Sequence, residues 1–361
     1  MKKLATVLGF VAVFVSACSR EGARPPAAKV DQPPAAAGEV TLEGAGATFP
    51  FPIYSRWAYD YQAASGVKLN YQSIGSGGGI AQIKAGTVDF GASDAPLTAS
   101  ELDEAGLTQF PMILGGVVLA IHVKGVDTGT LKLSREALAG IYLGRVKKWN
   151  DPALTGPNPG LALPDLDITV VHRADGSGTT WIFTNYLDKI SPDWHAGPGC
   201  GKSVSWPVGV GAKGNEGVAA YVQRLNGAIG YVEYAFAEQN KMAVTQLQTG
   251  TGGFVAPSMA AFEAAAANAD WVNAPGFYLV LTDQPGDATW PIAGASFILL
   301  HRDQKDAARA VQMLRFFDWC FKNGKDSARS LRYVPIPDSV AKLVTERWKK
   351  EILSGGKPVW E

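Results

Sequence analysis

Three short segments of this chain place glycines and small hydroxyl residues directly before an apolar helical pattern: residues 44–50 (GAGATFP), 73–79 (SIGSGGG) and 173–180 (RADGSGTT). Glycine lets the backbone approach a ligand closely, and the first turn of a helix has unpaired N–H groups at the positive end of its dipole. One such segment is usually an ordinary helix cap, but three together favour an oxyanion site. None has the lysine that follows the last glycine of a nucleotide-binding loop, which disfavours nucleotide hydrolysis.

The N-terminus has the pattern of a secretory signal peptide over residues 1–17. A basic start precedes an apolar run at 4–15 that is too short to span a bilayer comfortably, and small residues lead up to Cys18. Cleavage after Ala17 suits ordinary secretion, yet a cysteine at the cut resembles a lipoprotein signal, so we favour Cys18 as a lipidation site. Residues 18–38, rich in proline and alanine, are predicted to be a tether. We expect a periplasmic or otherwise extracytoplasmic protein, anchored to the membrane through Cys18.

The remaining residues, 39–361, suffice for one large or two ordinary domains. Hydrophobic residues make up 47% of the chain and charged residues 18%, with a formal net charge of zero, which is typical of a folded globular protein. The chain has no basic run and no net positive field, so nucleic acid is not an expected partner. An anion site here has to rely on local dipoles.

The cysteines and histidines give no sign of a metal or haem. Cys200 and Cys320 lack a CxxC partner and can be either a disulfide or two free thiols. The four histidines show no ligand spacing: they are His122, His172, His195 and His301. We expect no cofactor and no metal.

Strand and helix patterns alternate along the chain, which predicts an α/β fold with ligands at the carboxyl ends of the strands. Strands are predicted at 69–74, 88–92, 115–123, 166–171 and 295–301. Helices are predicted at 54–64, 79–84, 135–143, 180–186, 217–225, 307–320 and 338–353. The strands at 117–123 and 295–301 are alike in length and polarity and are candidates for a hinge pair. Phe316, Phe317 and Trp319 are predicted to be core residues, not a stacking platform.

Five segments closely resemble one family in order and spacing: residues 44–62, 71–98, 170–187, 214–240 and 316–325. It is the family of phosphate-binding proteins of the bacterial high-affinity phosphate ABC transporter, the PstS family. The resemblance implies a two-lobed periplasmic-binding-protein fold, type II-like, with mixed and parallel sheets flanked by helices and the ligand in the cleft between the lobes. Lobe I would comprise 39–115 and 293–361, and lobe II would comprise 116–292.

The resemblance also implies a set of phosphate contacts in this chain. They fall on Thr48, Phe49, Ser76, Asp94, Arg173, Ser177, Gly178 and Thr179. Asp175 takes the place of a carboxylate that pairs with the arginine, although by itself it could be a cap or turn residue. The departures are small, namely Gly77 where a second serine can stand and His172 before the arginine. His172 precedes Arg173 in the predicted strand, so its side chain should point away from the ligand.

The chemistry of phosphate gives Asp94 a specific task. Phosphate at neutral pH keeps at least one proton, so a tight site needs many donors and one acceptor. Asp94 supplies that acceptor, and a fully ionised sulfate would leave it facing an unprotonated oxygen. The alternative is an aspartate that only forms the turn before Ala95 and Pro96. From the residues alone both interpretations stand, and the resemblance favours the binding one.

Taken together, the sequence predicts a monomeric, non-enzymatic receptor that captures inorganic phosphate and delivers it to the membrane permease subunits of an ABC transporter. A receptor for another tetrahedral oxyanion, sulfate or molybdate, is the first alternative, and Asp94 argues against it. A secreted phosphatase-like enzyme is the second, and it would need a base or two metals beside its nucleophile.

Overall fold

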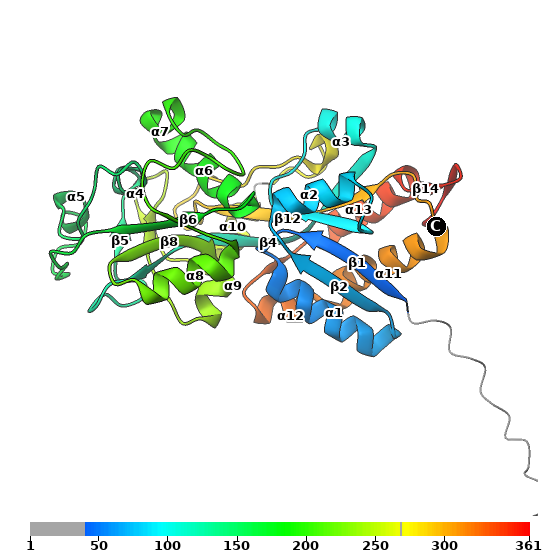
Figure 1. Cartoon of the computed structure of the whole chain (residues 1–361), viewed down its shortest axis with the longest axis horizontal. Helices are drawn as coiled ribbons and strands as arrows, with labels where there is room; N and C mark the ends of the chain where they lie inside the picture. The colour runs from blue at the N-terminus through cyan, green and yellow to red at the C-terminus, as the bar shows by residue number, and fades with distance from the viewer. Residues whose placement is uncertain (1–39, 268) are drawn as a thin grey trace, which may run out of the picture. The chain divides into compact units, whose positions relative to one another are not determined.

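A mixed sheet organises the part of the chain that this computed structural model describes, residues 40–267 and 269–361 (Figure 1). Its strand order is β2-β1-β3-β12-β4-β8-β6-β7, with β9 and β13 also paired to β4. The bounds of these strands are β1 Thr41–Gly46, β2 Lys68–Ser73, β3 Phe90–Ser93, β4 Leu107–His122, β6 Thr169–Arg173, β7 Val210–Ala212, β8 Ala228–Glu233, β9 Ala243–Val244, β12 Ala293–His301 and β13 Val334–Pro335. The small sheets comprise β5 Lys132–Leu133, β10 Gln246–Gln248 and β11 Phe254–Val255, and β14 Leu353–Ser354 with β15 Lys357–Pro358.

Parallel pairing at both ends of this sheet agrees with the predicted alternation of strands and helices. Strand β1 pairs in parallel with β2 and β3, and β6 pairs in parallel with β7 and β8. Between them, β4 runs antiparallel to both β12 and β8. The sheet therefore has two parallel ends joined through an antiparallel centre.

Strand β4 joins the two ends because it changes partners along its length. Residues 107–116 pair with β12, and residues 117–122 pair with β8. All of its residues except His122 are buried, as expected for a strand covered on both faces. The sequence prediction began this strand at Gly115, too late, because Thr108, Gln109 and a proline interrupt the apolar run. Gln109 belongs in the strand because its side chain is bonded to Leu97 and Gly276.

The two segments predicted as a hinge pair, 117–123 and 295–301, are not paired with each other, and their role as a hinge stays a prediction. Strand β12 lies against residues 107–116 of β4 and not against 117–123. The residues just before β12 lie against the middle of β4. The Val117 N–H donates to the carbonyl of Ile292 at 2.8 Å, and the Trp290 indole N–H donates to the carbonyl of Val117.

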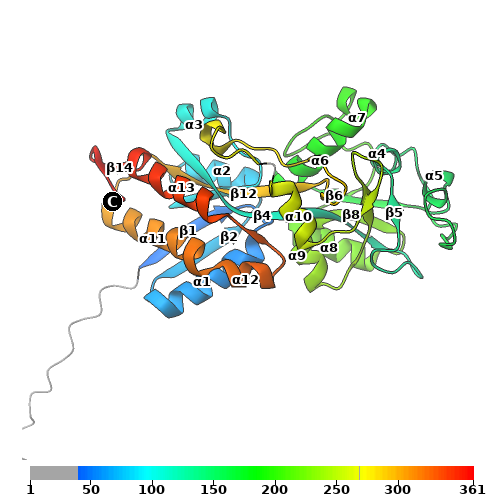
Figure 2. The ribbon, with the colours of Figure 1, turned by 180° about the vertical axis from the view of Figure 1, so that it is seen from behind.

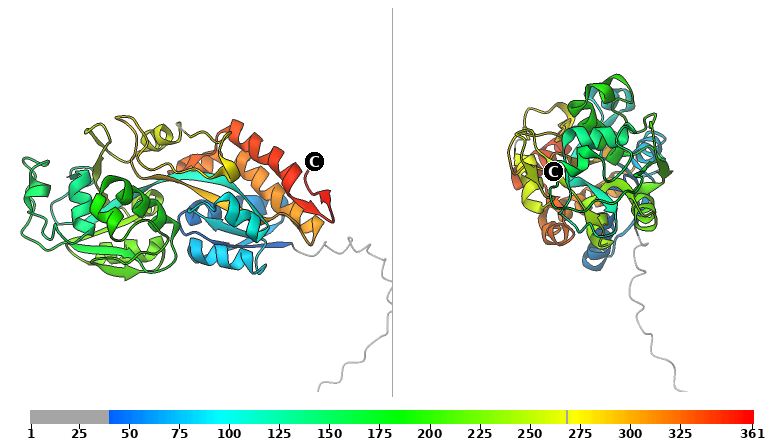
Figure 3. Two further views of the ribbon diagram at one scale, coloured as in Figure 1. Left: turned by 90° about the horizontal axis from the view of Figure 1, so that it is seen from above. Right: turned by 90° about the vertical axis from the view of Figure 1, so that its left-hand side faces the viewer.

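Helices cover the sheet, and segments far apart in the sequence lie together at one end of it. Helix α1 packs against α11 and α12 as well as against β2 (Figure 2). Seen from above, the N-terminal strands and the C-terminal helices share one end, and residues 135–240 form the other (Figure 3). The helix bounds are α1 Phe51–Ser65, α2 Ser76–Lys84, α3 Ala99–Ala105, α4 Arg135–Tyr142, α5 Pro152–Thr155, α6 Gly178–Ile190, α7 Pro192–Ala196, α8 Gly214–Arg224, α9 Tyr234–Gln239, α10 Met259–Ala267, a 3₁₀ turn Pro275–Phe277, α11 Ala307–Asn323, α12 Lys325–Ser330 and α13 Asp338–Glu351.

The core contains the aromatic residues that the sequence assigned to it. Phe316 and Phe317 are buried, and Trp319 is partly buried and packs on the core. Cys320 is buried and Cys200 is exposed, and the two are free thiols. The predicted signal peptide, Cys18 and the tether lie outside the described residues. Within 40–267 and 269–361, no helix combines the length and apolarity needed to cross a membrane.

Glycine at position 79 sets how closely α2 approaches the sheet. A Cβ on Gly79 would lie 2.5 Å from the Cα of Gly46 and 2.7 Å from the carbonyl oxygen of Ala92. These neighbours are backbone atoms of β1 and β3, so they cannot rotate away. The start of α2 is therefore held against the carboxyl ends of two parallel strands.

We expect Gly79→Ala to lower the free energy of unfolding by about 1–3 kcal/mol, because the new methyl has to displace backbone. Gly217→Ala in α8 is the matched control, since its Cβ would meet nothing nearer than 3.5 Å. That control should gain about 0.5–1 kcal/mol from the lower entropy cost of ordering alanine. Urea denaturation of the ligand-free protein measures both changes. An equal change in the free energy of unfolding for the two variants would mean that α2 can shift away from the sheet to make room for the methyl group.

Candidate anion-binding site

The three glycine and hydroxyl segments come together at the carboxyl ends of β1, β2 and β6. Helix α2 begins at Ser76, and α6 begins at Gly178 with Ser177 as its N-cap. The eight predicted contact residues are all buried. The structure therefore brings together residues that lie more than a hundred positions apart in the sequence.

Ser76 links the two ends of the sheet through one oxygen. Its Oγ accepts the backbone N–H of Asp94 at 3.1 Å and the backbone N–H of Gly178 at 3.0 Å. A Cβ on Gly178 would lie 2.6 Å from the Cβ and Oδ2 of Asp94, so only glycine permits this approach. The Asp94 side chain thus lies directly against the first residue of α6.

Asp94 is a buried carboxyl group with an unused hydrogen-bond acceptor among the described residues. Its Oδ1 has no hydrogen-bond partner within the described residues, although the side chain is enclosed. Burial raises the pKa of Asp94 to about 7, and the nearby Ser296 hydroxyl, the Arg173 charge and the Ser76 hydroxyl offset part of that rise. Near neutral pH this group can therefore either hold a proton or accept one.

Arg173 reaches the same place on a side chain that Asp175 holds in position. Its Nε donates to Asp175 Oδ1 at 2.7 Å and its Nη2 donates to Oδ2 at 2.5 Å, while Nη1 lies 3.4 Å from Thr179 Oγ1. Asp175 also accepts the N–H of Gly214. Burial opposes its charge, but the Arg173 hydrogen bond and charge outweigh burial and lower the pKa of Asp175. The two residues form a bidentate ion pair.

The two glycine-rich segments also contact each other directly. The Gly77 N–H donates to the carbonyl of Gly176 at 2.8 Å. Gly75 has φ +87°, and a Cβ there would lie 2.4 Å from Asp175 Oδ2. A side chain at position 75 would therefore meet the carboxylate that orients Arg173.

The remaining predicted residues differ in how they are held. Phe49 packs its ring on Tyr333, and its carbonyl oxygen accepts the Tyr333 hydroxyl at 2.7 Å. Ser177 Oγ accepts the Thr180 N–H, which leaves its own proton available. His172 stacks on Trp206 and its Nδ1 lies 3.0 Å from the carbonyl oxygen of Arg173. The imidazole therefore packs against a residue that is not one of the predicted contacts, in agreement with the expectation that His172 points away from the ligand.

Asn215 is a central residue that the sequence analysis did not single out. It lies in the first turn of α8, is fully buried, and its side-chain amide donates to Thr48 Oγ1 at 2.7 Å and to Thr179 Oγ1 at 3.2 Å. The signal that could have found it is a fourth glycine-rich segment before a helix, residues 209–217 (GVGAKGNEG). Glu233, which is buried at the end of β8 and bonded to Tyr333, was missed as well.

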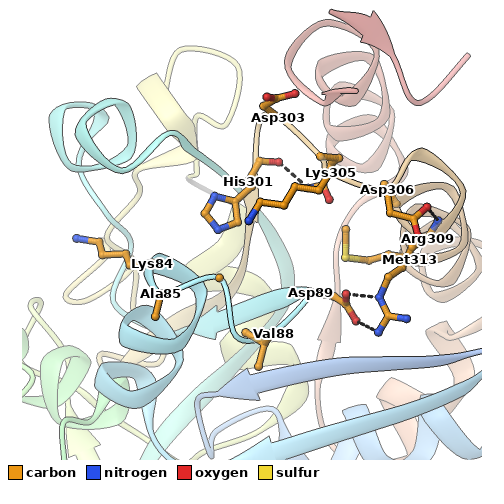
Figure 4. A pocket seen from close by; sticks show the side chains of 13 residues that line it. Lys84, Ala85, Val88, Asp89, His301, Asp303, Lys305, Asp306, Arg309 and Met313 are labelled. Atoms are coloured by element: carbon orange, nitrogen blue, oxygen red, sulfur yellow. Dashed lines mark hydrogen bonds and ion pairs between the residues drawn. The ribbon is translucent and has the colours of Figure 1, made fainter. Parts of the chain in front are cut away.

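A separate hollow of about 310 Å³ lies at the C-terminal end of α2 and is lined by Lys84, Asp89, His301 and Arg309 among others (Figure 4). Two of its polar side chains have partners: Asp89 accepts from Arg309, and His301 Nε2 lies 2.7 Å from the carbonyl oxygen of Ile83. It shares no residue with the anion site. Within the described residues, no group of three or more His, Cys, Asp or Glu side chains is placed to hold a metal ion.

The sequence relatives of this chain include several proteins with the same description, phosphate-binding protein PstS. Residues 31–323 match the family model described as the PBP superfamily domain. The phosphate-binding protein PstS of Xylella fastidiosa is 54% identical over 312 residues, which cover 86% of each chain. The phosphate-binding protein PstS of Pasteurella multocida is 52% identical over 322 residues, covering 89% of this chain and 94% of that protein.

Solved structures share the fold at low sequence identity. A high-affinity periplasmic phosphate-binding protein bound with phosphate has a TM-score of 0.71 at 22% identity, covering 89% of this chain and 98% of the other. A putative phosphate ABC transporter substrate-binding protein from Clostridium perfringens with bound phosphate has a TM-score of 0.60 at 16% identity, covering 82% and 100%. With more than half of the aligned residues identical to the PstS proteins over most of both lengths, the chain belongs to the PstS family of phosphate-binding proteins, within the PBP superfamily.

Proposed function

We propose that this protein is a non-enzymatic receptor that captures inorganic phosphate outside the cytoplasm and delivers it to the permease of an ABC transporter. The observation that carries the proposal is Asp94 Oδ1, a buried acceptor without a partner among the described residues, placed at the start of α6. An acceptor surrounded by donors fits an anion that still carries a proton. The names of the relatives, phosphate-binding protein PstS, support the same ligand.

The donors of the proposed site come from both ends of the sheet. Hydroxyl groups are supplied by Thr48, Ser76, Ser177 and Thr179, and the guanidinium fork by Arg173. Backbone N–H groups are supplied by Phe49, Ser76 and Thr179, whereas the Gly178 N–H donates to Ser76 Oγ and lets α6 approach the ligand closely. The N–H groups at a helix start have no intrahelical acceptor and are free to bind an oxyanion. We propose that these groups together surround one orthophosphate.

Selectivity follows from the single acceptor. Above about pH 7 Asp94 is ionised. There phosphate still brings a P–OH hydrogen to the carboxylate, whereas sulfate brings none, so both oxygens would stay buried without a hydrogen between them. A site built around such a bond can reject an analogue that lacks it by about 10⁴ to 10⁵. Sulfate and molybdate receptors do not need this carboxylate. Phosphatase chemistry would need a base beside a serine, and His172 is packed against Trp206 instead.

Closure of two lobes over the ligand is part of the proposal. Lobe I would comprise 39–115 with 293–361, and lobe II would comprise 116–292, with the boundaries where β4 changes partners. Direct hydrogen bonds join these parts: Thr48 with Asn215, Gly77 with Gly176, and Ser76 with Gly178. We further propose that the protein acts as a monomer, tethered through lipidated Cys18.

The proposal is tested by calorimetric titration with phosphate and then sulfate, in wild type and Asp94→Asn, after removal of bound anion. Wild type should bind phosphate at micromolar concentration or tighter and give no signal with sulfate. Asp94→Asn should narrow the ratio of phosphate affinity to sulfate affinity, because an amide can donate a hydrogen bond to an unprotonated sulfate oxygen. Asp89→Asn, a carboxylate bonded to Arg309, is the control and should keep the wild-type ratio. Equal binding of both anions by wild type would refute the proposal.

The raised pKa of Asp94 predicts how stability of the ligand-free protein depends on pH. A carboxyl with a pKa of about 7 in the folded state and about 3.9 unfolded favours folding when protonated. That contribution is complete below about pH 4 and is lost as the pH rises through about 7. Asp94→Asn should therefore become more stable relative to wild type between these values. Chemical denaturation from pH 4 to 8 measures the difference, and a constant difference would contradict the raised pKa.

Arg173→Lys keeps the charge but removes the planar fork that binds Asp175 and an oxyanion together. We expect phosphate affinity to fall at least about tenfold, because hydrogen bonds to charged groups contribute about 1.5–3 kcal/mol each. Arg309→Lys is a matched control, since Arg309 makes the same bidentate pair with Asp89 outside the site. It should lower stability and leave the dissociation constant unchanged. Similar phosphate affinities for the two lysine variants would mean that Arg173 does not bind the ligand.

A further inference from the structure

Asn215 contacts both halves of the proposed site through a single amide group. Its Nδ2 donates to Thr48 Oγ1 at 2.7 Å, in the segment after β1, and to Thr179 Oγ1 at 3.2 Å, in the first turn of α6. Its backbone N–H also donates to Thr48 Oγ1, at 3.2 Å. The residue is fully buried, so water does not compete for these bonds.

The orientation of this amide is fixed by its other end. Asn215 Oδ1 accepts the backbone N–H of Glu233 at 2.9 Å. A backbone N–H can only donate, so the atom that faces it has to be the amide oxygen. The amide nitrogen is then necessarily the atom that faces Thr48 and Thr179. Both of its hydrogens have acceptors, and the group has one possible orientation.

Counting lone pairs shows what this does to the two threonines. A hydroxyl oxygen has two lone pairs and one proton. Thr48 Oγ1 receives two hydrogen bonds from Asn215, and Thr179 Oγ1 receives one from Asn215 and a longer one from Arg173 Nη1 at 3.4 Å. Neither hydroxyl can accept a further bond, and neither proton has an acceptor among the described residues. Each proton is therefore available to a ligand.

We infer that Asn215 is a positioning residue that orders these hydroxyl protons, so that Thr48 and Thr179 can only donate to the bound anion. The inference rests on the proposed function and goes beyond it, because Asn215 need not touch the ligand. It also leaves the P–OH hydrogen to Asp94 and not to Thr48 or Thr179, since the two threonine oxygens cannot accept it. Asn215 thereby contributes to both affinity and recognition of the protonated anion.

Ser76 shows the same arrangement built from backbone alone. Its Oγ accepts the N–H groups of Asp94 and Gly178, which fills its lone pairs and leaves its proton to donate. Three hydroxyl groups of the site thus have their acceptor capacity filled by rigid donors. For Ser76 the donors are main-chain groups, whereas Thr48 and Thr179 each receive one of their two hydrogen bonds from the side chain of Asn215, which can be replaced.

The test is a double-mutant cycle read by titration with inorganic phosphate. Asn215→Ala should weaken phosphate binding about tenfold or more in the wild-type background, because two hydroxyls regain the freedom to rotate. In a Thr48→Val/Thr179→Val background the same substitution should weaken binding less than about twofold, since no hydroxyl is left to order. Equal losses in the two backgrounds, or no loss in wild type, would overturn the inference.

Two further variants separate this effect from damage to the fold. Asn158→Ala is the matched control: Asn158 is also buried, and its amide bonds the main chain of Lys132 and Leu154 outside the site. It should lower the unfolding midpoint and keep the phosphate affinity within about twofold, as expected for a substitution distant from the site. Asn215→Asp keeps an acceptor for the Glu233 N–H but offers oxygen to the threonine protons.

Asn215→Asp should therefore weaken phosphate binding strongly in wild type and clearly less in the valine background, where only charge repulsion persists. Circular dichroism of each ligand-free variant shows whether it is folded. Wild type that fails to bind phosphate would overturn the proposed function itself. Wild type that binds phosphate while Asn215→Ala and Asn215→Asp bind equally well would overturn only the role of Asn215.

Discussion

An enclosed carboxyl group at the start of a helix is the constraint on which the rest of this site depends. Asp94 lies so close to Gly178 that no side chain fits between them, and its Oδ1 has no partner in the described part of the chain. Burial favours the protonated acid, whereas the Ser296 and Ser76 hydroxyls and the Arg173 charge favour the carboxylate, and the result is a pKa of about 7. A group balanced in this way is stable beside an anion only when one proton lies between them. Above about pH 7, where Asp94 has lost its own proton, the proposed site therefore favours a ligand that brings one.

The same balance explains why the charges of the site largely cancel. Arg173 carries one positive charge, but Asp175 neutralises it through two hydrogen bonds, and Asp94 adds between zero and one negative charge. Attraction for an anion has to come from oriented N–H and O–H dipoles, which act at short range and in a water-excluded space. This agrees with a chain whose formal net charge is zero. Binding by dipoles also demands exact placement, which explains why glycines bring the two ends of the sheet into direct contact.

Much of this arrangement could be predicted from local pattern, and the parts that could not depend on long-range contacts. The glycine and hydroxyl segments contain Asp175 and seven of the eight residues that the family resemblance implies as phosphate contacts, whereas Asp94 came from the resemblance alone. The structure brings all of them together. The starts of α2, α6 and α8 were predicted two or three residues late, because the glycine and polar residues before each apolar pattern were assigned to the preceding segment, although they already belong to the helix. The start of strand β4 was predicted eight residues late, because the buried hydrogen-bond partners of the polar side chain of Gln109 lie in distant segments and cannot be read from local sequence. Asn215 was missed because its partners lie 36 and 167 residues away.

Selectivity for a protonated anion requires more than one well-placed acceptor, because any hydroxyl group can also accept a hydrogen bond. Each hydroxyl that is free to rotate could take the P–OH hydrogen in place of Asp94, and the carboxylate would then lose its discriminating effect. Thr48, Thr179 and Ser76 are prevented from doing so because rigid donors occupy their lone pairs. Among these four side chains, only the Asp94 carboxylate has an oxygen without a hydrogen-bond partner in the described part of the chain, and in the proposed site that oxygen faces the ligand. In the proposed site Asp94 and Asn215 therefore act together: Asp94 supplies the acceptor for the P–OH hydrogen, and Asn215 keeps the hydroxyl oxygens of Thr48 and Thr179 from accepting it.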